Sequence, residues 1–192
     1  KLGLNIPALD IRAQCSGFSW GLSTADAFIK SNNYKTVLLI GAEIHSRVLE
    51  YSPKFRTVSV LFGDGAGALI VKADSYDKKL SAECNRRGVI DCYMGNDGSS
   101  AEKLAMLRPG MVPGKKDFIT PQEADHRDYV PYMEGKEVFK TAVEKMVYTA
   151  RTLCERNNIT VNDLSLVIAH QANIRIISAV QTKLEISEDK VF

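Results

Sequence analysis

Cys15 and His170 are the two side chains whose type and position suggest chemistry. Cys15 lies where an apolar segment ends and a helical pattern begins. A thiol at a helix N-terminus meets the positive end of the helix dipole, which favours the thiolate and lowers the pKa of the thiol. His170 follows the apolar run 164–169 and precedes a second helical pattern. A cysteine together with a histidine is sufficient for covalent acyl chemistry.

Each of these residues also has an ordinary structural interpretation. Most lone cysteines are small buried core residues, and a histidine after a strand can be a capping or hydrogen-bonded group. The two residues together are stronger evidence for a catalytic site than either residue alone, because catalytic groups in open α/β sheets collect at the edge where the strands end. We therefore expect Cys15 to have a lowered pKa and to share one sheet edge with His170.

The remaining cysteine and glycine motifs point to no metal, disulfide or phosphate site. Cys84, Cys92 and Cys154 form no CxxC pair with one another or with Cys15. Structural zinc sites need such close ligands, and a disulfide framework is not expected at this cysteine density, so a reducing cytoplasmic setting is the default. The glycine-rich run 63–67 lacks the Lys and the Ser or Thr of a phosphate-binding loop, so we interpret it as a tight turn.

Composition excludes two classes of partner. The 192 residues carry 25 Lys and Arg against 23 Asp and Glu, without the basic excess that nucleic-acid binders show. The longest strongly apolar run, 37–40, is far below the roughly 18 residues that a membrane span needs. The chain begins with Lys rather than Met and stops at Val191-Phe192 without a polar tail, so we expect a fragment of a longer protein.

The order of the expected elements indicates an α/β fold. Apolar periodicity predicts helices over 16–30, 134–157 and 173–184, and buried strands over 7–13, 36–42, 69–71 and 164–169. A hairpin is expected over 80–94, and a long surface excursion over 94–131 with one short helix over 102–107. Strands that alternate with helices predict a largely parallel sheet.

Four segments, in order, resemble β-ketoacyl-acyl carrier protein synthase III of the thiolase superfamily. They are the nucleophile segment 10–18, the glycine-rich turn 62–68, the helix start 133–140 and the histidine motif 170–176. The string His-Gln-Ala-Asn in the last segment is the most specific. The resemblance implies a thiolase-like layered fold of mostly parallel sheets packed with helices.

The resemblance also implies how the chain divides. Residues 1–93 would be the rest of the N-terminal thiolase-like half with the nucleophile, 94–131 the excursion, and 132–192 the start of the C-terminal half with the histidine. The family's N-terminal region would be lacking, as would its C-terminal end with the asparagine of a Gly-Asn-Thr motif.

The implied activity is a decarboxylative Claisen condensation of an acyl-CoA starter with malonyl-acyl carrier protein, which initiates fatty acid biosynthesis. Cys15 would carry the acyl group, His170 would assist decarboxylation, and neither a metal nor another cofactor is implied. Contacts with acyl carrier protein are implied for Gln171, Ala172, Asn173, Ile174, Arg175 and Lys140. The family also implies a cytoplasmic homodimer.

Four other functions stay open at the level of sequence. A thiolase-like acyltransferase would pass the acyl group to an alcohol or an amine, and a polyketide- or quinolone-type enzyme would condense other substrates. A Cys–His hydrolase would release free acid, and a scaffold domain would do no chemistry.

Overall fold

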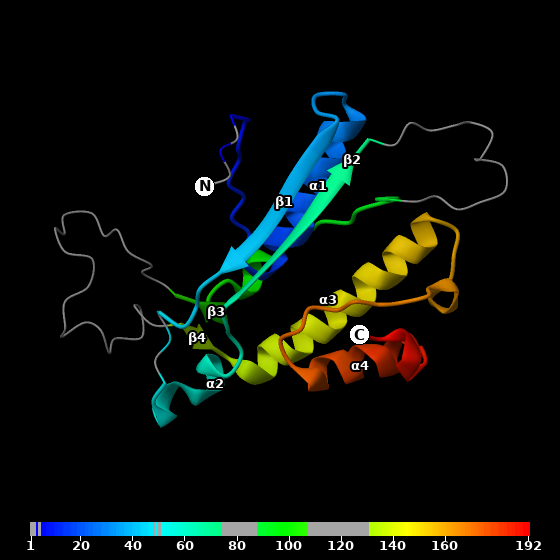
Figure 1. The fold of residues 1–192 in the computed structure, drawn as a ribbon. Helices are drawn as coiled ribbons and strands as arrows, with labels where there is room; N and C mark the ends of the chain where they lie inside the picture. Colours follow the sequence, from blue (N-terminus) through cyan, green and yellow to red (C-terminus); the bar gives the residue numbers. More distant parts are fainter. Residues whose placement is uncertain (1–2, 4, 48, 50, 74–87, 107–130) are drawn as a thin grey trace. The chain divides into compact units, whose positions relative to one another are not determined.

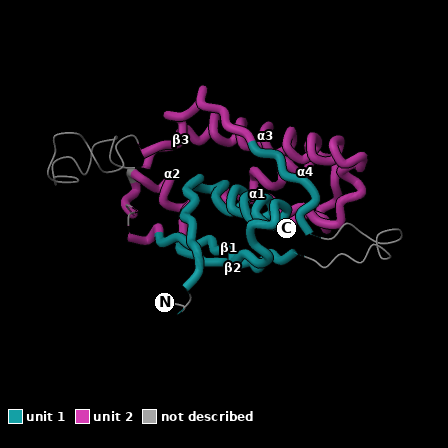
Figure 2. Tube along the Cα trace, turned by 90° about the horizontal axis from the view of Figure 1, so that it is seen from above, with its two compact units in different colours: residues 1–44, 64–94 teal, residues 45–63, 95–192 magenta. Residues whose placement is uncertain are grey.

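The computed structural model describes residues 3, 5–47, 49, 51–73, 88–106 and 131–192. The chain divides into two compact units, which Figure 2 shows in separate colours. The first unit comprises residues 1–44 and 64–94, and the second comprises residues 45–63 and 95–192. The expected three-part division into 1–93, 94–131 and 132–192 stays a prediction.

The first unit is a helix packed on a two-stranded sheet. Helix α1 (Gly17–Lys30) runs along one face of the strands β1 (Thr36–Glu43) and β2 (Gly65–Lys72), as Figure 1 shows. A Cβ placed on Gly21 would lie 2.5 Å from Cδ1 of Leu39, so a larger residue there would require Leu39 or the helix to shift. The helix expected over 16–30 is confirmed.

The direction of strand pairing differs from the expectation. The α/β class is confirmed, but β1 pairs with β2 in antiparallel register from Thr36 opposite Lys72 to Glu43 opposite Gly65. The parallel arrangement is therefore wrong for this pair. A continuous apolar run predicts burial but carries no information on the direction of the neighbouring strand. The face of β1 that does not meet α1 is also open, with Leu38 41% and Ile40 55% exposed.

Three further expectations about local structure are wrong. Residues 7–13 form no strand, and Leu9 is 67% exposed, because no neighbouring strand pairs with this apolar segment in the described residues. The glycines of the run 63–67 form no separate turn before the strand, since β2 already begins at Gly65. In place of the helix over 102–107, strand β3 (Leu104–Ala105) pairs with β4 (Tyr132–Met133).

The run 164–169 is less regular than expected. Among the residues that the structure describes, Val167 pairs through a single parallel bridge with Val191. Residues 80–87 of the expected hairpin and 107–130 of the expected excursion lie outside the described residues.

The second unit has its core between two helices. Helix α3 (Gly135–Arg156) and helix α4 (Ile174–Leu184) confirm the helices expected over 134–157 and 173–184. Their facing apolar side chains enclose Leu184, which is 2% exposed. The core consists of Val143, Val147, Ile176, Val180, Leu184 and Ile186. The short helix α2 (Arg56–Ser59) belongs to the same unit, and no helix in the described part of the chain is long and apolar enough to cross a membrane.

Candidate active site

Cys15 stands in a sharp turn at the start of α1. The turn is a 3-10 helix, Gln14–Ser16, that leads directly into Gly17. Gln14 has φ 49°, a left-handed conformation that is uncommon for a residue with a side chain. Ser16 stabilises the turn, because its Oγ donates a hydrogen bond of 2.8 Å to the carbonyl of Ala13. A strained turn before a helix is the arrangement in which nucleophiles of acyl-transfer enzymes are presented.

The thiol of Cys15 is free, and its pKa is raised rather than lowered. Desolvation by neighbouring atoms is the largest cause, although the residue as a whole remains exposed. A backbone hydrogen bond lowers the pKa, and the carboxylate of Glu43 raises it further. The expectation of a lowered pKa is therefore wrong, because desolvation and one like charge outweigh the favourable position at the helix start.

Sequence reasoning missed Glu43 as a part of this site. It is the last residue of β1 and therefore stands where that strand ends. The sequence signal that could have found it is its position directly after the strand expected over 36–42. Its negative charge opposes the formation of a second negative charge on Cys15.

His170 stands between the strand-like run that ends at Ala169 and the helix α4. The run is held to the end of the chain by two backbone hydrogen bonds: Val167 donates to Lys190 over 2.7 Å, and Phe192 donates to Val167 over 3.0 Å. His170 itself is exposed. Its position after a strand and before a helix is thus confirmed, although the strand consists of one bridge.

The residues after His170 have separate tasks in the local structure. The side-chain amide of Gln171 donates to the carbonyls of Ala169 and Phe192, over 3.1 and 2.9 Å. Asn173 is the N-cap of α4, and its Oδ1 accepts a hydrogen bond of 2.9 Å from the backbone of Arg175. This is the usual role of asparagine at a helix start.

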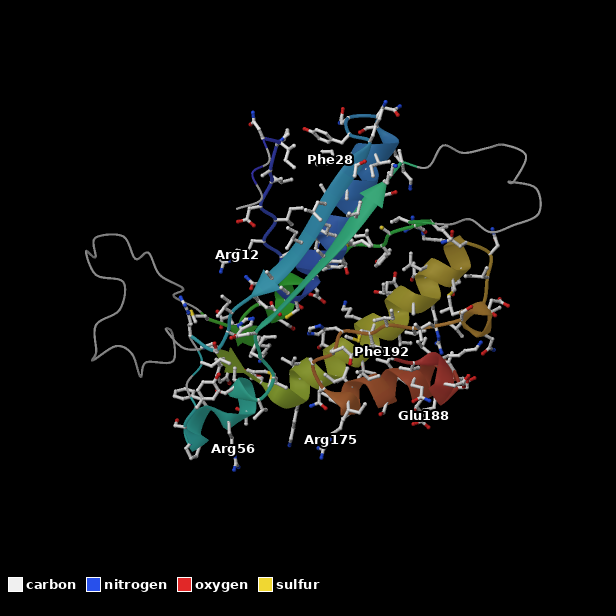
Figure 3. All side chains as sticks on the ribbon, viewed as in Figure 1. Arg12, Phe28, Arg56, Arg175, Glu188 and Phe192 are labelled. Carbon is white, nitrogen blue, oxygen red and sulfur yellow. The ribbon has the colours of Figure 1, made fainter. Side chains whose placement is uncertain are left out.

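The positions implied for carrier-protein contact differ in exposure. Ile174 is 72% exposed, while Ala172 is partly buried. Arg175 is exposed, and Figure 3 shows its side chain extending outward from the start of α4. Lys140 is exposed on α3 in the same unit. Their role in contact with a carrier protein stays a prediction.

Cys15 belongs to the first unit, and His170 belongs to the second. The shared sheet edge that sequence reasoning assigns to them therefore stays a prediction. In the described ranges, no group of three or more His, Cys, Asp or Glu side chains is placed to hold a metal ion.

Comparison with known proteins supports the family resemblance that the sequence motifs suggested. Residues 9–98 match the family profile described as 3-oxoacyl-(acyl carrier protein) synthase III, and residues 154–192 match the profile for the C-terminal part of the same family. A β-ketoacyl-(acyl carrier protein) synthase III from Chlorobium luteolum is 38% identical over 189 residues, which are 97% of this chain and 53% of the relative. One from a Sulfurovum species is 41% identical over 193 residues, covering 100% of this chain and 52% of the relative.

A solved structure gives the same result for the fold. The crystal structure of 3-oxoacyl-(acyl carrier protein) synthase III from Aquifex aeolicus superposes with a TM-score of 0.74 at 37% identity, covering 95% of this chain and 50% of that chain. The fold is thus that of the thiolase-like α/β enzymes. Within this class, the chain belongs to the 3-oxoacyl-(acyl carrier protein) synthase III family. It spans about half the length of the curated relatives that it matches.

Proposed function

We propose that the protein that contains this chain is an acyltransferase of fatty acid biosynthesis. It condenses an acyl-CoA starter with malonyl-acyl carrier protein and releases CO₂. The observation that carries this proposal is the position of Cys15, a free thiol in a strained turn at the start of α1, in a chain of this family.

In the first half-reaction, the sulfur of Cys15 attacks the thioester carbonyl of the acyl-CoA. A bond forms between Sγ and the acyl carbon, and the thiol of CoA leaves. Because the pKa of Cys15 is raised, the thiol needs a group that accepts its proton during this attack. The backbone N–H groups at the start of α1 are donors that suit the negative oxygen of the tetrahedral intermediate.

In the second half-reaction, the malonyl thioester loses CO₂, and the resulting carbanion attacks the acyl carbon on Cys15. The Cys15 thiolate leaves, and a β-ketoacyl thioester forms on the carrier protein. His170 donates a hydrogen bond to the thioester oxygen as negative charge develops there. Donors aimed at developing charge usually provide the largest catalytic contribution.

Carrier-protein docking is assigned to the surface around α4. The set comprises Gln171, Ala172, Asn173, Ile174, Arg175 and Lys140. Arg175 and Lys140 are exposed cations, which suit an acidic carrier protein through long-range attraction. We also assign a cytoplasmic homodimer. The free thiols of Cys15 and Cys154 support a reducing compartment, and the resemblance to the family supports the dimer.

The test uses the full-length protein with acyl-CoA and malonyl-acyl carrier protein. We expect CO₂ and a β-ketoacyl product in equal amounts from the wild type. Cys15→Ala should abolish acylation, and His170→Ala should lower decarboxylation by at least about a hundredfold. Cys154→Ala is the matched control, because that thiol is buried within the second unit.

Each competing function gives a different result in this assay. Acyl transfer to an added alcohol or amine without CO₂ release would indicate an acyltransferase that does not catalyse condensation. Release of free acid without dependence on the carrier would indicate a hydrolase. If iodoacetamide modifies Cys15 no faster than the buried Cys154, the chain has no reactive nucleophile, and the proposal fails.

A further inference from the structure

The side chain of Gln171 joins the two backbone segments that flank His170. Its Nε2 donates to the carbonyl of Ala169 over 3.1 Å and to the carbonyl of Phe192 over 2.9 Å. Ala169 directly precedes His170, whereas Phe192 lies 21 residues beyond Gln171. One amide group therefore connects the start of the histidine turn to a segment far along the chain.

The two segments already run side by side. Val167 forms a parallel bridge with Val191, and Phe192 donates a backbone hydrogen bond of 3.0 Å to Val167. Gln171 adds two side-chain hydrogen bonds to this connection, at the point where the backbone turns into His170.

The amide group of Gln171 has two N–H donors, and the structure gives each a carbonyl acceptor. These donors are consequently engaged inside the second unit. The next tether after His170 is the N-cap of α4, where Asn173 accepts from the backbone of Arg175. His170 is therefore held on both sides, by Gln171 toward the strands and by Asn173 toward the helix.

We propose that Gln171 is a positioning residue for His170, and that its main contribution lies in this connection rather than in contact with a carrier protein. The inference rests on the proposed function, in which His170 serves decarboxylation. Loss of the connection leaves the backbone turn less restrained, and displacement of a catalytic group by about 1 Å can lower a rate by about a hundredfold.

The decisive variant is Gln171→Met, which keeps the length of the side chain and removes both donors. Gln181→Met is the matched control, because Gln181 also donates to a backbone carbonyl of this unit, that of Ile186 over 3.3 Å, at the other end of α4. Both variants are prepared in the full-length protein, and their melting temperatures are compared first.

Three quantities are measured for each variant: the rate of Cys15 acylation by acyl-CoA, and kcat and KM for decarboxylation with malonyl-acyl carrier protein and with malonyl-CoA. For Gln171→Met we expect kcat for decarboxylation to fall by about ten- to a hundredfold with both malonyl donors. Acylation of Cys15 and KM for the carrier protein should change by less than about twofold. Gln181→Met should match the wild type.

Several results would overturn the inference. A rise in KM confined to malonyl-acyl carrier protein would make Gln171 a docking residue. Equal loss in both half-reactions, or a loss that Gln181→Met shares, would indicate general destabilisation. An unchanged kcat would also reject it. If the wild type fails to decarboxylate malonyl donors, or His170→Ala is as active as the wild type, the proposed function fails together with the inference.

Discussion

Glu43, at the end of β1, raises the pKa of Cys15, in the turn before α1. Two residues that are 28 positions apart in the sequence therefore interact electrostatically within the first unit. The negative charge of Glu43 thus opposes the thiolate, whereas a position at the start of a helix favours it.

The charge of Glu43 can be removed without a change of shape. Glu43→Gln should lower the pKa of Cys15, because a negative charge no longer opposes the thiolate. The thiolate fraction at neutral pH then increases, and alkylation of Cys15 by iodoacetamide should become a few-fold faster. The measurement is the alkylation rate as a function of pH, with Glu102→Gln in the second unit as control. A slower or unchanged rate would contradict the assigned interaction.

The contact between α1 and β1 depends on Gly21. In Gly21→Ala the new methyl group meets Cδ1 of Leu39 at 2.5 Å, so either the Leu39 side chain or the helix must shift. Overpacking of this kind costs about 1–3 kcal/mol of stability, which urea unfolding measures. Gly17→Ala in the same helix is the control, because no atom lies within 4 Å of a Cβ placed there. Equal stability of the two variants would contradict the close packing.

The carboxylate of Asp97 is held ionised to low pH. Hydrogen bonds from the Ser99 side chain, from Lys145 and from the Ser99 backbone lower its pKa from 3.8 to about 2. A lowered pKa stabilises the folded state above pH 3.8, and this contribution is lost as the pH falls from 3.8 to about 2. NMR titration of the carboxyl carbon should show the low pKa directly.

Two variants separate the causes of this shift. Ser99→Ala and Lys145→Met should each raise the pKa of Asp97, because the Ser99 hydroxyl is the largest single cause and Lys145 contributes both a hydrogen bond and a charge. The Lys145 ammonium lies 3.1 Å from Asp97, but both side chains are partly exposed to solvent. An unchanged pKa in either variant would contradict the assigned contribution of that residue.

Arg175 tests the docking surface. Arg175→Glu should raise KM for malonyl-acyl carrier protein by about tenfold or more at low salt and leave KM for malonyl-CoA unchanged, because steering acts on the acidic carrier. The effect should shrink as salt is added. Arg156→Glu, in the last turn of α3, is the control. An equal change for both malonyl donors would place Arg175 in substrate binding rather than in docking.

The three long helices α1, α3 and α4 and the family could be predicted from the sequence, because both depend on residues that are close together along the chain. The apolar stripe of α3 repeats with the helical period, and its members pack in the core with α4. Asn173 and the left-handed Glu185 mark the two ends of α4. The motifs around Cys15 and His170 identified the family for the same reason, since each is a short contiguous string.

The direction of strand pairing and the raised pKa of the Cys15 thiol were decided only by tertiary structure. Whether an apolar segment pairs, and in which direction, depends on a partner distant in sequence; β1 therefore pairs antiparallel with β2, and Leu9 stays exposed. The pKa of Cys15 follows desolvation and Glu43, which surround it through folding, while its position at a helix start was visible in the sequence. Periodicity and motif are properties of neighbouring residues, whereas pairing and electrostatics are properties of the residues that folding brings together.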